Sequence, residues 1–244
     1  MVVHNERMNR WVKRGLIAIP VLIALAFGAI LIYANFINDP PDRLSEAQLS
    51  ERVAEAATSP STDGTDPPSG ASVDGTWNVT EESEFGYRVE EVLFGINTTA
   101  AGRSNQISGS MSIDGTTVTD ASFTVDVGSI TSDETRRDSQ FRGRIMEVDQ
   151  FPEATFTLGA PIEFGTVPVA GDQITASATG DLTLHGVTRS VTFDVTAEAG
   201  ANRIGVLGTI PVRFADYDID NPSIGGVTTE DNGLLEFILV FEPA

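Results

Sequence analysis

The sequence contains no cysteine, one lysine and only two histidines among its 244 residues. The lack of cysteine excludes disulfides, thiolate catalysis and sulfur-ligated zinc or iron–sulfur sites. Two histidines, His4 and His185, are too few for a multi-histidine metal site, so we expect no metal. Basic residues are also scarce, with 15 against 35 acidic ones and a net charge of −20. We therefore expect no binding to nucleic acid, because phosphate recognition needs clustered lysine and arginine.

A long apolar run without charged residues lies near the N-terminus, from Leu16 to Ile37. As a helix it would reach roughly 33 Å, enough to cross a hydrocarbon core of about 30 Å. Basic residues precede the run and acidic residues follow it. The positive-inside rule thus predicts a cytoplasmic tail over 1–14, a transmembrane signal-anchor helix over 15–37 and an extracytoplasmic remainder. A cleaved signal peptide is the alternative, which the length of the run and the poor cleavage site disfavour.

Residues 38–75 have the composition of a flexible acidic linker, rich in proline, serine and threonine and without aromatic residues. Ser45 and Gln48 form a possible capping box, and apolar residues recur every four positions after it. This pattern predicts one short helix within the linker. The remaining residues, 76–244, are enough for one globular domain.

Apolar and polar residues alternate throughout residues 76–244, as in Val191–Val195 and Ile210–Phe214. A period of two is typical of strands with one buried face, and tight-turn signals such as Asp114-Gly115 separate them. We therefore predict an all-β domain, an antiparallel barrel or sandwich of about eight to ten strands. The segment 129–150 breaks this period and predicts a short helix and a loop, with Ser132 as a possible N-cap.

The side chains that the alternation turns inward are mostly large and apolar. A barrel of about eight strands either fills its interior with such side chains or encloses one apolar ligand, and the sequence leaves both alternatives open. The strand at 235–241 begins in alternation and becomes apolar on both faces. The candidate ligand-binding residues of the interior are Phe123, Val125, Val127, Phe156, Leu158, Leu182, Leu184, Phe193, Val212, Phe214 and Phe237.

Polar candidates are few. Arg136, Arg137, Arg142 and Arg144 form a basic cluster that suits an anionic headgroup, or else a solvated helix whose arginines pair with nearby acidic residues. His185 lies at a predicted turn, where a histidine that bonds the backbone is the simpler interpretation than a base or headgroup ligand. The acidic run that begins at Asp216 lacks the glycine and glutamate of a calcium loop.

Several motifs together resemble the YceI-like, polyisoprenoid-binding family over residues 75–242. They read GTWNV, RRDSQF, FPEATFT and GDLTLHGVT, and occur in that order from Gly75 to Thr188. The resemblance implies an extended lipocalin-like barrel with a helix beside it and a tunnel for a long isoprenoid chain. The membrane-anchored form and the segment 214–223 resemble the actinobacterial branch. Where many members have a His-Leu pair, this chain has Gln140-Phe141, which leaves the headgroup open.

The resemblance and the interior residues lead to one main hypothesis and two others. The first is a membrane-tethered binding protein for a polyprenyl or quinone lipid, without cofactor or catalytic residues. The second is a non-enzymatic envelope interaction or stress-response domain with a filled barrel. An enzyme ranks lowest, since the chain lacks cysteine, a nucleophile elbow and a phosphate loop. Family members are often dimeric, so a homodimer is also expected.

Overall fold

The computed structural model describes residues 25–32, 38–55, 73–166 and 171–244. Residues 25–32 form a helix, and among the described residues no helix has the length and apolar character needed to cross a membrane. Most of the anchor helix predicted over 15–37 lies outside the described residues, so the anchor stays a prediction.

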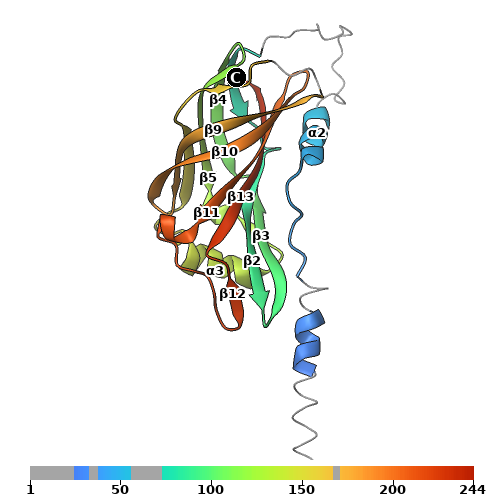
Figure 1. The fold of residues 1–244 in the computed structure, drawn as a ribbon, viewed down its shortest axis with the longest axis vertical. Coiled ribbons are helices and arrows are strands. Elements are labelled where there is room, and N and C mark those ends of the chain that lie inside the picture. Colours follow the sequence, from blue (N-terminus) through green and yellow to red (C-terminus); the bar gives the residue numbers. More distant parts are fainter. Residues whose placement is uncertain (1–24, 33–37, 56–72, 167–170) are drawn as a thin grey trace, which may run out of the picture.

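Within the described part of the chain, eight antiparallel strands close into a barrel through the pairing of the first with the last (Figure 1). The sequence-based expectation of an antiparallel barrel of about eight strands is therefore confirmed. The ring consists, in spatial order, of β1 (Gly75–Val79), β4 (Ile107–Asp114), β5 (Thr117–Asp126), β7 (Glu153–Leu158), β9 (Gln173–Leu184), β10 (Val187–Ala199), β11 (Ile204–Arg213) and β13 (Asn232–Pro243).

The sheet divides along one edge of β13. The C-terminal end of β13 pairs with β1, whereas residues 234–238 pair with β2 (Glu84–Leu93). β2 continues into a hairpin with β3 (Ile96–Ser104), so these two strands extend beyond the closed ring. Three short strands complete the sheet: β6 (Thr131–Ser132) beside β3, β12 (Val227–Thr229) beside β2, and β8 (Ile162–Glu163) beside β5.

The segment that breaks the strand period is helical, as predicted. A short 3-10 turn, η3 (Val127–Ser129), leads into it, and it contains the helix α3 (Thr135–Gln140) and a π-helical turn, η4 (Phe141–Ile145). The predicted N-cap was wrong by two residues, because the side chain of Glu134 caps α3 by accepting from Arg136 N. The hydroxyl of Ser132 instead accepts from the backbone N–H of Glu134.

The helix expected in the linker is α2 (Glu46–Glu55), and its capping box forms. The Ser45 backbone N–H donates to Gln48 Oε1 at 2.9 Å, and the Gln48 N–H donates to Ser45 Oγ at 3.4 Å. The described part of the predicted linker is not free, however, since α2 packs against the outside of the barrel (Figure 1). Leu49 is completely buried there.

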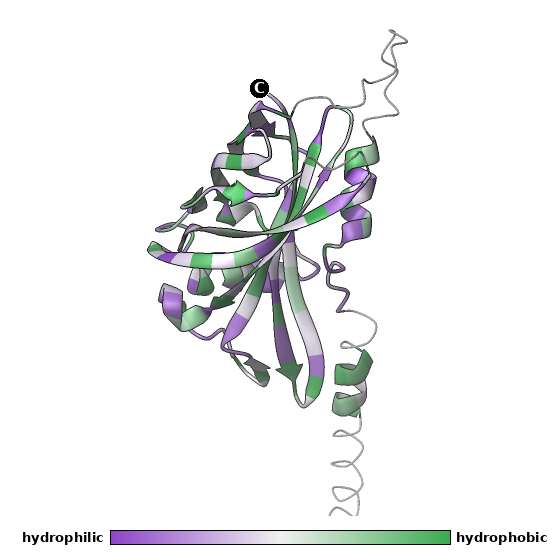
Figure 2. Ribbon diagram, turned by 45° about the horizontal axis from the view of Figure 1, so that its top comes forward, coloured by the Kyte–Doolittle hydropathy of each residue, from purple (hydrophilic) through white to green (hydrophobic). Residues whose placement is uncertain are grey.

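This docking explains why β13 is apolar on both faces. Along the long strands hydrophobic and hydrophilic residues alternate (Figure 2), as expected for one buried and one solvated face. In β13 the outward residues Ile238 and Val240 are also fully buried, because Leu49 and Val53 of α2 cover them. The second apolar face is therefore an interface with α2, while the first faces the barrel interior.

A buried ionic network continues this interface along β13. Glu236 points outward and is 3% exposed, and Arg88 Nε donates to its Oε1 at 3.2 Å. Arg103 binds the other carboxylate oxygen of Glu236. The same two arginines donate to the carbonyls of Pro41 and Asp42. The chain before α2 is thereby fixed along the outer surface of β2, β3 and β13.

Candidate functional site

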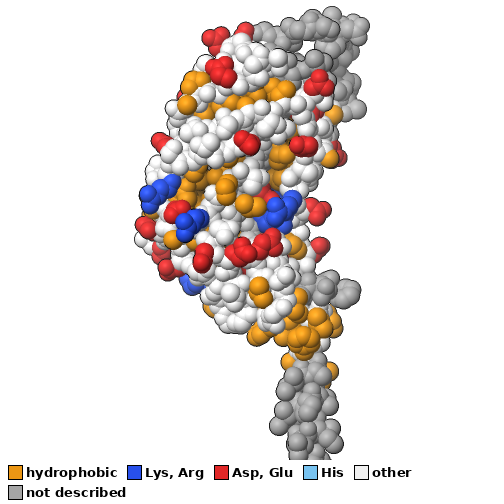
Figure 3. Space-filling model, viewed as in Figure 1, with side chains coloured by type: hydrophobic (Ala, Val, Ile, Leu, Met, Phe, Trp, Pro, Cys, Tyr) orange, Lys and Arg blue, Asp and Glu red, His pale blue; other side chains and the backbone are white. Residues whose placement is uncertain are grey.

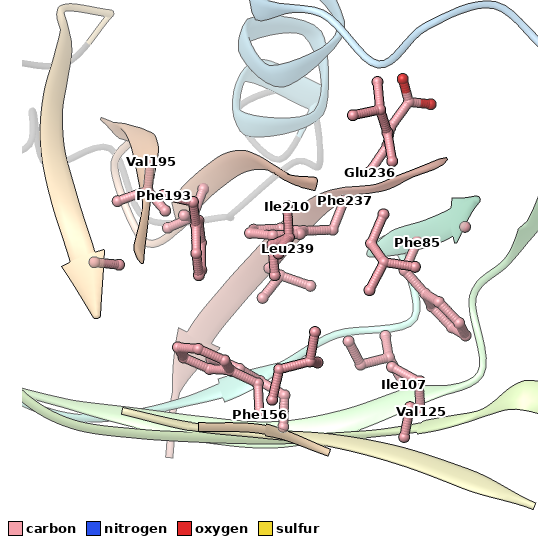
Figure 4. Close-up of a pocket in the computed structure, with 18 of the residues that line it drawn as sticks. Phe85, Ile107, Val125, Phe156, Phe193, Val195, Ile210, Glu236, Phe237 and Leu239 are labelled. Atoms are coloured by element: carbon pink, nitrogen blue, oxygen red, sulfur yellow. The ribbon is translucent and has the colours of Figure 1, made fainter. Parts of the chain in front are cut away.

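The barrel encloses an apolar cavity of about 280 Å³. Side chains from seven of the eight barrel strands, all but β1, line it, joined by side chains from β2 and from the helical segment after β6. Figure 4 shows Phe85, Val125 and Phe156 pointing into this space from different strands, while the Glu236 carboxylate points away from them. A cavity of this size approaches the range of known ligand sites, about 300–1,000 Å³.

All the interior residues predicted from the sequence line this cavity. The agreement follows from the period of two, since a one-residue error in register would have turned every one of them to the outside. That these residues contact a lipid stays a prediction. They are Phe123, Val125, Val127, Phe156, Leu158, Leu182, Leu184, Phe193, Val212, Phe214 and Phe237.

Aromatic rings wall the middle of the cavity. Phe193 packs edge-on against Phe156 and Phe237, with ring centroids 5.5 and 6.1 Å apart. The Phe237 ring lies directly over Gly208 on the neighbouring strand, where an added Cβ would approach ring carbon at 2.2 Å. Glycine at position 208 is therefore required for the ring to occupy this place.

Sequence reasoning missed the contribution of β2 and of the helical segment. Phe85, Tyr87 and Val89 alternate along β2 and line the cavity, a pattern that was visible in the sequence. Phe141 and Ile145 line it from η4, and the Phe141 ring stacks on Tyr87 at a centroid distance of 4.7 Å. The aromatic residue at position 141 thus contributes to the wall of the cavity.

The lining of the cavity is almost entirely apolar, but three polar side chains meet at one end of it. Glu91 on β2 and Thr229 on β12 are paired across the strands, and both line the cavity together with Arg137 of α3. Thr229 is buried, and its hydroxyl has no hydrogen-bond partner among the described residues. These three residues are called the polar end of the cavity below.

The charges at the polar end nearly balance. Burial raises the pKa of the Glu91 carboxyl, and nearby Arg137 opposes that rise. Arg137 forms an ion pair with Asp133 and donates to Asn38 Oδ1 at 2.9 Å. Burial also raises the pKa of Tyr87 far above its usual value, so its hydroxyl stays neutral. The polar end can therefore donate and accept hydrogen bonds without a strong net charge.

Arg137 is the one predicted headgroup residue that lines the cavity in the described structure. Arg136 is exposed on α3. Arg142 donates to the carbonyl of Ile130 at 3.2 Å, and Arg144 donates to the carbonyl of Pro222 at 2.9 Å. The structure therefore does not bring the four arginines together as one headgroup site.

His185 lies outside the cavity lining, in the turn between β9 and β10, with a φ of 51°. Its Nδ1 is 3.1 Å from the carbonyl oxygen of Tyr217, and its Nε2 is 3.2 Å from Glu147 Oε2. Its ring also packs edge-on against Phe151. These contacts match the simpler interpretation, a histidine that stabilises a turn.

Comparison with known proteins agrees with this architecture. The family model described as the YceI-like domain matches residues 77–241. A polyisoprenoid binding domain from Saccharophagus degradans superposes with a TM-score of 0.56 at 19% identity, covering 69% of this chain and 98% of that one. BcnA from Burkholderia cenocepacia gives a TM-score of 0.51 at 23% identity, and the match covers 66% of this chain and 98% of BcnA. At these identities the two structures show a shared fold.

Curated relatives carry the name UPF0312 protein. One from Vibrio parahaemolyticus is 32% identical over 127 residues, 48% of this chain and 64% of the relative. One from Pseudomonas putida is 33% identical over 109 residues, 42% of this chain and 53% of the relative. The matches thus span between about half and two thirds of the relatives' own length.

Proposed function

The chain belongs to the YceI-like domain family, and from this membership and its cavity we propose that it binds a polyisoprenoid or a similar long-chain amphipathic lipid. The observation that carries the proposal is the apolar cavity of about 280 Å³ with a polar end. An apolar interior suits a hydrocarbon tail, and a polar end suits a headgroup. The name of the Saccharophagus degradans relative, a polyisoprenoid binding domain, supports the same ligand class.

Burial of the tail would supply the affinity without any catalytic group. Burial of one isoprenoid unit removes five carbons from water. Each CH₂-sized group that is buried contributes about 0.8 kcal/mol to the binding free energy. A few units inside the cavity are enough for tight binding. We accordingly propose a binding protein and not an enzyme.

The polar end favours an uncharged headgroup that forms hydrogen bonds, such as a quinone or an alcohol. Arg137 is already paired with Asp133, and the Glu91 carboxyl lies beside it. A diphosphate would meet two carboxyl groups there, which repel it when ionised. The unpartnered Thr229 hydroxyl and the Arg137 guanidinium would instead bind a carbonyl or hydroxyl oxygen.

We further propose that the apolar run 16–37 tethers the barrel to the outer side of the cytoplasmic membrane, as in the actinobacterial type. The run has the length of a membrane span, and its flanking charges give the orientation. The docked segment 38–55 would then hold the barrel close to the bilayer where isoprenoid lipids reside. The homodimer expected from the resemblance also stays a prediction.

The filled-barrel alternative is disfavoured because the packed interior leaves this cavity open.

A substitution that fills the cavity tests the proposal. Ala178 on β9 is 2% exposed and lines the cavity, and the adjacent Ser177 is exposed on the outside. Ala178→Phe should abolish binding of a fluorescent polyprenol by the full chain, and Ser177→Phe should leave it unchanged. Equal binding by both variants would contradict a ligand site inside the barrel.

A further inference from the structure

Three large apolar side chains lie exposed at one end of the barrel. Val92 is 38% exposed, Phe94 is 56% exposed and Ile224 is 49% exposed. Among the described residues, the other large apolar side chains with comparable exposure belong to the helix 25–32. Exposed apolar side chains that gather in one place mark a surface for a partner or a membrane. We call Val92, Phe94 and Ile224 the apolar tip.

The apolar tip is built by two segments that are bonded to each other. The Phe94 backbone N–H donates to the carbonyl of Gly226 at 2.9 Å, and β12 pairs with the end of β2. Ile224 and Val227 exchange backbone hydrogen bonds of 3.0 and 2.9 Å. The three side chains are therefore held in fixed places relative to the barrel.

Phe94 is an unusual choice for its position. It begins the turn between β2 and β3 with a φ of 48°, followed by Gly95 with a φ of 89°. Turns of this kind favour asparagine, aspartate or glycine, because a bulky side chain is strained at positive φ. Phenylalanine here is unfavourable both for the backbone and for solubility. The ring lies over Gly226, where an added Cβ would meet ring carbon at 2.4 Å, yet more than half of the side chain stays exposed and open to a further contact.

Asn38 and Asp39, which directly follow the apolar run 16–37, lie close to the same end of the barrel. Asn38 donates to the carbonyl of Thr99 on β3 at 3.3 Å, and the Asp39 N–H donates to Asp133 at 2.8 Å. Thr99 lies three residues after the start of β3, about 10 Å along the strand. Figure 1 shows the β2–β3 turn, β12 and the helix 25–32 at the same end, opposite the C-terminus. Hydrophobic side chains gather at this end in Figure 3.

We propose that the apolar tip inserts into the bilayer surface and so orients the polar end of the cavity toward the membrane. This inference rests on the proposed tether. Glu91, at the polar end, lies one residue before Val92 on β2, so insertion would bring the cavity close to the lipid that it takes up. With a net charge of −20 the chain is not attracted to anionic headgroups. The contact is therefore apolar, and a neutral phosphatidylcholine bilayer is sufficient for it.

Because the chain has no cysteine, single-cysteine variants can be spin-labelled at one chosen site. The test uses the full chain in phosphatidylcholine vesicles with a label at Phe94→Cys or Val92→Cys. The matched control is Asp114→Cys, at an exposed residue that ends β4 and lies near the C-terminus of the chain. Paramagnetic relaxation by oxygen, which concentrates in lipid, is compared with relaxation by a water-soluble nickel chelate.

Insertion predicts an oxygen-to-nickel ratio several-fold higher at positions 92 and 94 than at 114. If the chain floats with the vesicles but the oxygen-to-nickel ratio at 92 and 94 is as low as at 114, the inference is overturned. The proposed tether would still stand. Low accessibility to both reagents would point to a second copy of the chain and would also overturn it. A chain that does not float would remove both the tether and the inference. Lipid extracted from the cavity is measured separately, so its absence would not alter the label result.

Discussion

Arg137 of α3 and Asn38 are joined by a hydrogen bond of 2.9 Å from the guanidinium to the side-chain oxygen. Arg137 lines the cavity, and Asn38 directly follows the apolar run. The residue that leaves the proposed membrane anchor is thereby bonded to the polar end of the proposed lipid site. The two parts of the proposed function meet at this contact.

Replacement of Arg137 should weaken headgroup binding. In Arg137→Gln the charged donor is lost, and a hydrogen bond of that kind contributes about 1.5–3 kcal/mol. We expect the affinity for a quinone with an isoprenoid tail to fall roughly tenfold or more. Arg136→Gln is the matched control, because Arg136 is exposed on the same helix. Equal affinities of the two variants in a fluorescence titration would argue against a headgroup at the polar end.

Glu91 should give the stability a specific dependence on pH. Burial raises its pKa in the folded chain above the usual 4.5, so folding favours the protonated carboxyl. The stability that this carboxyl contributes is therefore present below 4.5 and is lost as pH rises through the raised pKa. Glu91→Gln should unfold like the wild type at about pH 4 and be the more stable of the two at about pH 8. Denaturant titrations at both pH values check this, and a constant difference would exclude the assignment.

Leu49 should anchor α2 to the barrel. The side chain is completely buried against Ile238 and Val240. Leu49→Ala should lower the free energy of unfolding by about 2–4 kcal/mol, or release α2 from the barrel. Hydrogen exchange of the α2 amides distinguishes these results, since only release exposes them. Glu51→Ala, an exposed change in the same helix, should have an effect within about 0.5 kcal/mol. Slow exchange and unchanged stability in Leu49→Ala would contradict the docking.

Replacement of Glu236 should destabilise the fold more than replacement of an exposed carboxylate on the outer surface. It is 3% exposed and pairs with Arg88 and Arg103. Glu236→Gln would leave the buried guanidinium of Arg88 without a counter-charge and that of Arg103 with Glu84 alone, at a cost of about 3 kcal/mol. Glu242, which pairs with Arg203, is half exposed, so Glu242→Gln should cost less than about 1 kcal/mol. Thermal unfolding of both variants measures the difference, and equal costs would show that the buried network is not important for stability.

The barrel and its lining could be predicted from the sequence because they depend on local alternation. Phe123 and Phe193 are far apart in the chain, yet each one's face follows from its own neighbours. The docking of α2 had a weaker signal in the sequence. The second apolar face of β13 indicates that another element packs on it, but does not identify that element. At the polar end, the basic cluster in the sequence indicated Arg137, whereas Glu91 and Thr229 had no local signal. Glu91, Arg137 and Thr229 meet only because β12 pairs with β2 and α3 packs beside them.

The central claim is that the barrel holds a lipid, and the most direct test is mass spectrometry of an organic extract of the purified full chain. The chain should be isolated from membranes, with an unrelated barrel prepared in the same way as the control. We predict about one long-chain isoprenoid per chain in the extract, and none from Ala178→Phe. An extract without lipid, from a folded wild-type chain, would contradict the proposed function.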